Sequence, residues 1–108
     1  MTTFTLADLT ALIGARATSL ADRSYTRTLL DAGVPRIAKK FGEEAVEMVI
    51  AAVEGNKAAL LSEAADVLYH LMVLLHASNL SLDQVTEELG RRTHQSGHDE
   101  KLSRPPAS

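Results

Sequence analysis

Apolar side chains recur at three- and four-residue spacing along much of this chain, the spacing of one face of an α-helix. The first predicted helix runs from about Leu6 to Ala21, behind a capping-box sequence at 5–8. The second begins near Pro35, a residue favoured in the first helical turn, and ends at Gly55. Both helices have one apolar face that needs a partner.

The third predicted helix is the most apolar stretch of the chain. Asn56 can cap its first turn, and its apolar residues continue from Ala58 to Leu75. The polar interruptions within its richest part, residues 64–77, are Asp66, His70 and His76. That part is too short and too interrupted for a transmembrane span, so we expect a core helix and no membrane partner. A small chain has few elements to cover such a helix, and we expect a second subunit to do so.

Two segments are less regular. Ser81 offers an N-cap for a short fourth helix that extends to about Arg92. Residues 22–33 are compatible with an ordered loop or with a short helix capped near Ser24 and ended by Gly33. The pattern does not decide between these two alternatives.

These elements predict one all-α domain of four to five helices at residues 1–95, followed by a polar tail at 96–108. The tail has no helical periodicity, so it is either flexible or ordered by a ligand or partner. The second and third helices are joined only by a short turn at 55–56. This turn predicts an antiparallel helix hairpin at the core, with the bundle completed by oligomerisation.

Composition agrees with an aliphatic helical core. The chain has 108 residues, of which 45% are apolar and only 4% aromatic. It has no cysteine, which excludes disulfides and thiolate metal sites. The net charge of -3 argues against a nucleic-acid partner, and residues 1–6 lack the features of a secretion signal. A cytoplasmic location is compatible with these observations.

Two pairs of carboxylates interrupt the otherwise apolar helices. Glu44 and Glu47 are three residues apart in the second helix, as are Glu63 and Asp66 in the third, so each pair shares a helix face. Glu47 lies eight residues before the turn and Asp66 ten residues after it, which brings the pairs level in an antiparallel hairpin. Unpaired charge in an apolar setting costs several kcal/mol unless it is neutralised or bound to a metal. We therefore expect the four carboxylates to share an ion.

Four oxygen donors favour a hard cation, Mg²⁺ or Mn²⁺, over zinc or copper. Magnesium commonly binds carboxylates together with substrate phosphates, so the site indicates a polyphosphate substrate and phosphoanhydride hydrolysis. A di-iron site would require glutamate followed three residues later by histidine, and this sequence lacks that spacing. A solvated acidic stripe is the ordinary explanation of one such pair, but two level pairs in apolar surroundings favour the metal site.

Two segments carry a resemblance to a known family. Residues 39–47 (KKFGEEAVE) and 63–70 (EAADVLYH) are similar to the all-α nucleotide pyrophosphatases of the MazG-like superfamily. Within that superfamily, residues 24–26 and parts of the tail resemble the phosphoribosyl-ATP pyrophosphatases of histidine biosynthesis. His98 and Leu102 depart from the family pattern, which bears on how the tail docks.

The resemblance implies hydrolysis of phosphoribosyl-ATP at its α-β phosphoanhydride bond, with Mg²⁺ stabilising the departing pyrophosphate. It implies that Glu44, Glu47, Glu63 and Asp66 are the metal ligands. Glu43, which shares a face with Glu47, is then the candidate general base.

Substrate contacts are predicted at five positions. Lys39 and Lys40 could merely pair with the glutamates four residues later, but lysine before glutamate is the poorer orientation, and we favour contacts with phosphate. On the family resemblance alone, Tyr25, Lys101 and Arg104 are expected to contact ribose or phosphate.

Two other functions are compatible with the sequence. A house-cleaning nucleoside triphosphate pyrophosphatase would use the same metal chemistry on a different base. A non-catalytic helical oligomerisation module would explain the apolar third helix without any reaction. In all three cases we expect a homodimer or a larger homo-oligomer.

Overall fold

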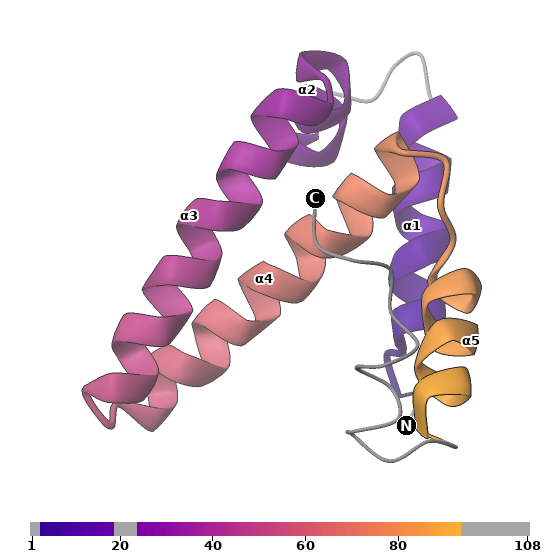
Figure 1. Ribbon diagram of the computed structural model, residues 1–108. Helices are drawn as coiled ribbons and strands as arrows, with labels where there is room; N and C mark the ends of the chain where they lie inside the picture. The colour runs from indigo at the N-terminus through magenta and orange to yellow at the C-terminus, as the bar shows by residue number, and fades with distance from the viewer. Residues whose placement is uncertain (1–2, 19–23, 94–108) are drawn as a thin grey trace, which may run out of the picture.

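A computed structural model describes residues 3–18 and 24–93 of the chain. Within these ranges the protein is all α, with no strand, and the helices follow one another as Figure 1 shows. Their bounds are α1 Leu6–Thr18, α2 Tyr25–Ala32, α3 Val34–Val53, α4 Lys57–Ala77 and α5 Leu82–Thr93. The predicted all-α class is confirmed, while the predicted end of the first helix at Ala21 lies outside the described residues.

The segment that the sequence left open contains a short helix, α2. The Ser24 hydroxyl accepts a hydrogen bond from the Arg27 backbone N–H at 3.2 Å, which caps its first turn. Gly33 ends it with φ of 93°, a conformation that residues with a Cβ rarely adopt. The same glycine begins α3, since its carbonyl accepts from the Ile37 N–H at 3.1 Å. One residue therefore separates α2 from α3.

The antiparallel hairpin of α3 and α4 is the most extensive helix pair in the structure (Figure 1). Gly55 has φ of 72°, and the Asn56 backbone N–H donates back to the Ala51 carbonyl at 3.1 Å. The Asn56 side chain then accepts from the Ala59 N–H at 3.0 Å and caps α4. The predicted turn and cap are both present.

Capping boxes also begin α1 and α5. The Thr5 N–H donates to the Asp8 carboxylate at 2.9 Å, and the Asp8 N–H donates to the Thr5 hydroxyl at 3.0 Å. Ser81 and Gln84 form the same reciprocal pair at 2.8 and 3.1 Å. Leu82, the first residue of α5, packs against the core, which ties α5 to the rest of the structure.

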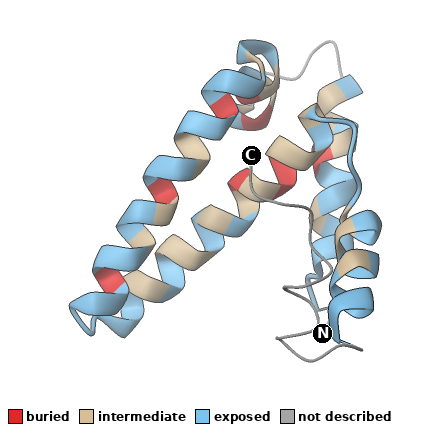
Figure 2. Ribbon diagram, viewed as in Figure 1, coloured by how far each residue is buried: buried red, intermediate tan, exposed pale blue. Residues whose placement is uncertain are grey.

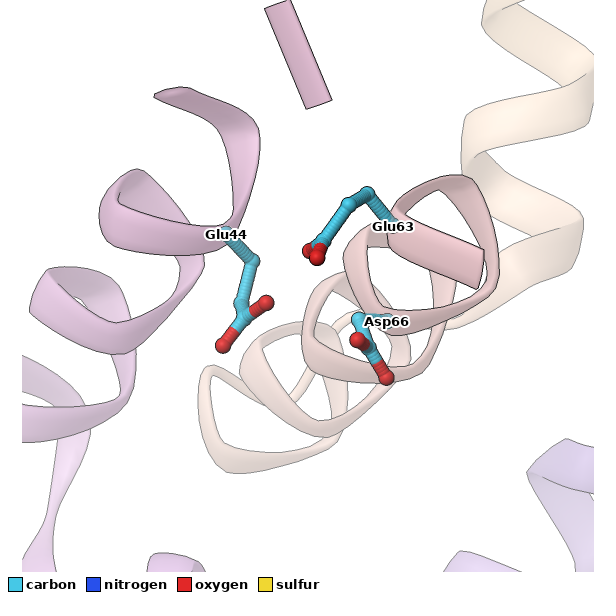
Figure 3. Close-up of side chains that lie close together, drawn as sticks. All are labelled: Glu44, Glu63 and Asp66. Atoms are coloured by element: carbon cyan, nitrogen blue, oxygen red, sulfur yellow. The ribbon is translucent and has the colours of Figure 1, made fainter. Parts of the chain in front are cut away.

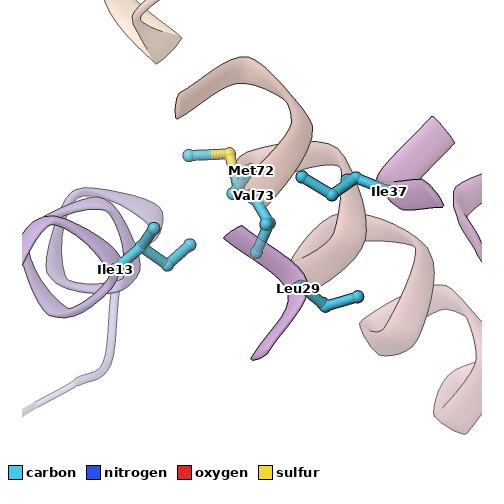
Figure 4. Close-up of a cluster of buried hydrophobic side chains, with 5 residues drawn as sticks. All are labelled: Ile13, Leu29, Ile37, Met72 and Val73. Atoms are coloured by element: carbon cyan, nitrogen blue, oxygen red, sulfur yellow. The ribbon is translucent and has the colours of Figure 1, made fainter. Parts of the chain in front are cut away.

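The hydrophobic core lies at the end of the hairpin away from its turn. There α1 and α2 pack against the start of α3 and the second half of α4 (Figure 1). Five side chains form the buried cluster in Figure 4: Ile13, Leu29, Ile37, Met72 and Val73. Full burial of one such side chain contributes about 1.5–3 kcal/mol to stability. The core therefore fixes one end of the hairpin.

The turn end of the hairpin is much less covered, as Figure 2 shows. Large apolar side chains are at least two-fifths exposed on both helices: Val46, Val49, Ile50, Val53, Leu61 and Leu68. The Cα radius of gyration is 16.3 Å, against about 13 Å for a compact domain of this length. A single protomer thus leaves this apolar surface open to water.

The apolar character of α4 has a second consequence. It is the one described helix long and apolar enough, by length and composition alone, to cross a membrane. Core helices of globular proteins meet the same criterion, and α4 contributes Met72 and Val73 to the core. It also carries Glu63 and Asp66, which a lipid-facing helix would have to bury at high cost.

We predict that Ile37→Ala lowers the free energy of unfolding by about 2–5 kcal/mol, because Ile37 is fully buried and the cavity cannot collapse completely. Urea denaturation followed by circular dichroism measures the change. Leu89→Ala is the control, since it removes as many carbon atoms from a side chain that is 55% exposed on α5. Equal losses in the two variants would contradict the position of the core.

Candidate functional site

Three carboxylates converge between α3 and α4. Glu44 comes from α3, and Glu63 and Asp66 come from α4, as Figure 3 shows. One oxygen from each side chain lies within 4.8 Å of an oxygen from each of the others. Glu44 is buried, Glu63 is half-buried and Asp66 is exposed, so the cluster opens from the hairpin to solvent. The arrangement can place three oxygen ligands around one cation.

The hairpin explains why these residues meet. Glu63 and Asp66 are one turn apart on the same face of α4. The turn at Gly55 makes α3 run back beside α4, and its geometry brings Glu44 level with that face. Glu44 therefore becomes a neighbour of residues 19 and 22 positions further along the sequence, as the sequence predicted for these three carboxylates.

The carboxylate of Glu63 has one buried oxygen atom, Oε2, without a hydrogen-bond donor among the described residues. Burial raises the pKa of the Glu63 carboxyl, and the negative charges of Glu47 and Glu44 raise the pKa further. A buried acceptor without a donor is rare in native proteins. A cation in the cluster would supply the missing partner and favour the ionised form.

Glu47 lies one turn after Glu44 on α3 and is exposed. It does not belong to the group of three, although its charge acts on Glu63. Its role as a fourth ligand stays a prediction.

A cavity of about 450 Å³ lies between α2 and α3, beside the carboxylate cluster. Its volume is in the range of small-molecule sites. The polar part of its wall contains four residues that the sequence singled out and one that it did not: Tyr25, Lys39, Lys40, Glu43 and Arg36. The structure thus brings the predicted substrate-binding residues of the described part into one pocket.

Lys40 connects the pocket with the carboxylates. Its Nζ lies 3.5 Å from Oε1 of Glu44, so the simple ion pair considered in the sequence analysis is present. The electrostatic interaction with Tyr25 raises the pKa of Lys40, and the hydrogen bond to Glu44 raises it further. Lys40 therefore stays charged at the boundary between the pocket and the cluster.

His70 joins α4 to the pocket wall. It is buried, and its Nδ1 lies 2.7 Å from the Asp66 backbone carbonyl. A carbonyl can only accept, so Nδ1 carries the hydrogen. In the neutral ring Nε2 is then the acceptor, and the Tyr25 hydroxyl donates to it at 3.2 Å. This chain of two hydrogen bonds fixes the Tyr25 ring relative to a metal-ligand candidate.

Sequence reasoning left two of these residues without a role. Arg36 falls at helical spacing from Lys39, Lys40 and Glu43, which was the available signal. His70 is one turn beyond Asp66, but only the fold reveals that Tyr25 faces it. Lys101 and Arg104, the predicted contacts from the tail, lie outside the described residues.

Comparisons with known proteins agree on one family. The family model described as phosphoribosyl-ATP pyrophosphohydrolase matches residues 6–93. The phosphoribosyl-ATP pyrophosphatase of Azorhizobium caulinodans is 60% identical over 100 residues, which cover 93% of this chain and 92% of the relative. That of Methylobacterium radiotolerans is 58% identical over 107 residues, covering 99% and 100%. Phosphoribosyl-ATP pyrophosphatase 1 of Rhodopseudomonas palustris is 55% identical over 104 residues, covering 96% and 97%.

The raised pKa of Glu63 predicts a pH-dependent stability in metal-free protein. The folded state holds the Glu63 proton more tightly than the unfolded chain, whose glutamates titrate near pH 4.3. Stability therefore falls as the pH rises through the interval between the two pKa values, and Glu63→Gln removes that loss. We expect the variant to be more stable than the wild type at pH 7–8 in EDTA, with the difference shrinking toward pH 4.

Urea unfolding at successive pH values measures this difference. Glu87→Gln, at an exposed position on α5, is the control for the loss of one carboxylate. Identical pH profiles of stability for the wild type and Glu63→Gln would show that ionisation of Glu63 costs the folded state no stability.

Proposed function

Because this chain belongs to the phosphoribosyl-ATP pyrophosphohydrolase family, we propose that it hydrolyses phosphoribosyl-ATP to phosphoribosyl-AMP and pyrophosphate. The bond that breaks is the α-β phosphoanhydride, and the step belongs to histidine biosynthesis. One structural observation carries the proposal: Glu44, Glu63 and Asp66 converge beside a pocket rich in cationic side chains. That combination suits a polyphosphate bound through a metal ion.

The cluster fits Mg²⁺, with Mn²⁺ as a substitute. All its donors are carboxylate oxygens, and the buried Glu63 Oε2 lacks a partner in the described residues. We assign Glu44, Glu63 and Asp66 as ligands and Glu47, one turn away, as the fourth. A bound Mg²⁺ supplies positive charge for the negative charge that develops on the leaving pyrophosphate.

The side chains of the pocket would bind and orient the substrate. Lys39 and Lys40 offer ammonium groups to phosphate oxygens, and Tyr25 is held in place by its hydrogen bond to His70. Hydrolysis adds one water across the anhydride, so a base must accept a proton from that water. Glu43 is the proposed base, since its carboxylate lines the pocket.

The exposed apolar face of the hairpin supports a homodimer or larger homo-oligomer. Val46, Val49, Ile50 and Val53 recur along one side of α3, and Leu61 and Leu68 do so on α4. A second copy could cover both stripes and build a helical bundle around two hairpins. The carboxylate clusters would then lie inside a larger apolar assembly.

We predict that Asp66→Asn and Glu44→Gln each lower pyrophosphate release from phosphoribosyl-ATP by more than about a hundredfold. Residues that merely orient metal ligands already contribute 10–100-fold. A coupled pyrophosphate assay with Mg²⁺ measures the loss, and circular dichroism checks helicity. Asp83→Asn, at an exposed position of α5, should retain activity.

Thermal stability gives a second measurement for the same variants. The melting temperature of the wild type should rise with Mg²⁺ by mass action, while that of Asp66→Asn should stay constant. No shift in the wild type at millimolar Mg²⁺ would favour the non-catalytic module. Faster turnover of canonical nucleoside triphosphates than of phosphoribosyl-ATP would favour the house-cleaning activity.

We predict that Ile50→Glu dissociates the oligomer, because it places a charge at the centre of the exposed stripe on α3. Sedimentation velocity at micromolar concentration measures the mass. Ala11→Glu introduces the same charge at an exposed position of α1 and should leave assembly intact. A wild-type protein that sediments as a monomer would contradict the proposed assembly.

A further inference from the structure

We infer that Arg36 and Lys39 form a separate binding site for the phosphate of the substrate's phosphoribosyl group. The inference rests on the proposed function. It adds to that function the part of the pocket that distinguishes phosphoribosyl-ATP from ATP. Three features of the described residues carry it: the face of α3 on which these cations lie, their lack of a carboxylate partner, and their position beside the carboxylate cluster.

The cationic side chains are arranged on one face of α3. Arg36, Lys39, Lys40 and Glu43 follow the spacing of successive helical turns, and all four line the cavity. Helix α2 forms the facing wall with Tyr25 and its neighbours. The cavity, at about 450 Å³, has the volume of a small-molecule site, and none of the three clustered carboxylates lines it. It has room for a substrate group next to the cluster.

The charges on this wall are unequally neutralised. Lys40 pairs with Glu44 at 3.5 Å. Arg36 and Lys39 make no ion pair with any residue in 3–18 or 24–93. Two cations without a carboxylate partner in a concave wall attract an anion. The guanidinium of Arg36 adds a planar fork of donors that matches the oxygens of a phosphate monoester.

The proposed substrate has two anionic parts. Its triphosphate needs the cation held by Glu44, Glu63 and Asp66. The phosphate of its phosphoribosyl group then needs a second positive site within the length of the same molecule. Arg36 and Lys39 supply that charge on the adjoining face of α3. Since ordinary ATP lacks this phosphate, the site selects against ATP and favours phosphoribosyl-ATP.

A thermodynamic cycle that combines one change in the protein with one change in the substrate tests the contact between Arg36 and the phosphate of the phosphoribosyl group. The protein change is Arg36→Gln, and the substrate change is from phosphoribosyl-ATP to ribosyl-ATP, which lacks only the phosphate of the added ribose. We expect Arg36→Gln to lower kcat/KM for phosphoribosyl-ATP about 10- to 100-fold, chiefly through KM. Its effect on ribosyl-ATP should stay below about threefold, because the interacting phosphate is already absent.

Two further variants test the role of the guanidinium group and control for the loss of a positive charge. Arg36→Lys keeps the charge but loses the planar fork, so it should restore part of the lost kcat/KM. Lys57→Gln removes an exposed cation at the start of α4, at the turn end of the hairpin, and should leave both substrates unaffected. Melting curves confirm that each variant is folded.

Equal losses on the two substrates would overturn the inference, since Arg36 would then serve the triphosphate or the fold. An unchanged kcat/KM for phosphoribosyl-ATP would overturn it as well. If the wild type hydrolyses neither substrate, the proposed function fails, and binding still tests the site. Ribose 5-phosphate titrated into the wild type should bind at least about tenfold more tightly than into Arg36→Gln, and equal affinities would reject the site.

Discussion

The repulsion among carboxylates held between α3 and α4 is the interaction on which the candidate site depends. Three carboxylates whose oxygens lie within 4.8 Å of one another repel, and burial of Glu63 adds to the cost. The apolar cluster at the end of the hairpin away from its turn holds the helices together despite this cost. The fold thus maintains a concentration of negative charge that a divalent cation would relieve, so a cation at the proposed site would stabilise the hairpin.

The pocket and the carboxylate cluster are mechanically connected. Lys40 lines the pocket and pairs with Glu44, while His70 links the Asp66 backbone to the Tyr25 hydroxyl. One connection runs along α3, and the other crosses from α4 to α2. A substrate in the pocket would therefore contact side chains whose partners are the residues proposed to hold the metal. This arrangement favours joint positioning of nucleotide and cation.

Local signals made the helices and the hairpin predictable. The capping boxes and the turn at Gly55 and Asn56 involve residues only a few positions apart. Their geometry can therefore be predicted from the local sequence. The level placement of Glu44, Glu63 and Asp66 follows from the turn and the helical rise.

The pocket was not predictable in the same way. It depends on how α2 packs against α3, and the sequence left residues 22–33 open between loop and helix. The position of Arg36 in a pocket wall and the contact of His70 with Tyr25 emerge only once that packing is known, because the opposite wall and the hydrogen-bond partner both come from α2. Glu47 illustrates a different limit, since its carboxylate acts on Glu63 without joining the group of three, and helical spacing alone does not fix that distance.

The backbone bends at Gly33, between the two helices that form the walls of the pocket. With φ of 93° and ψ of 168°, Gly33 occupies backbone space that is essentially reserved for glycine, and it alone separates α2 from α3. Tyr25 lies on one side of this bend and the cationic side chains lie on the other. The angle between the two walls of the pocket therefore depends on the dihedral angles of Gly33 together with the packing of Leu29 against Ile37, so a change at this glycine would reshape the pocket without altering any side chain that lines it.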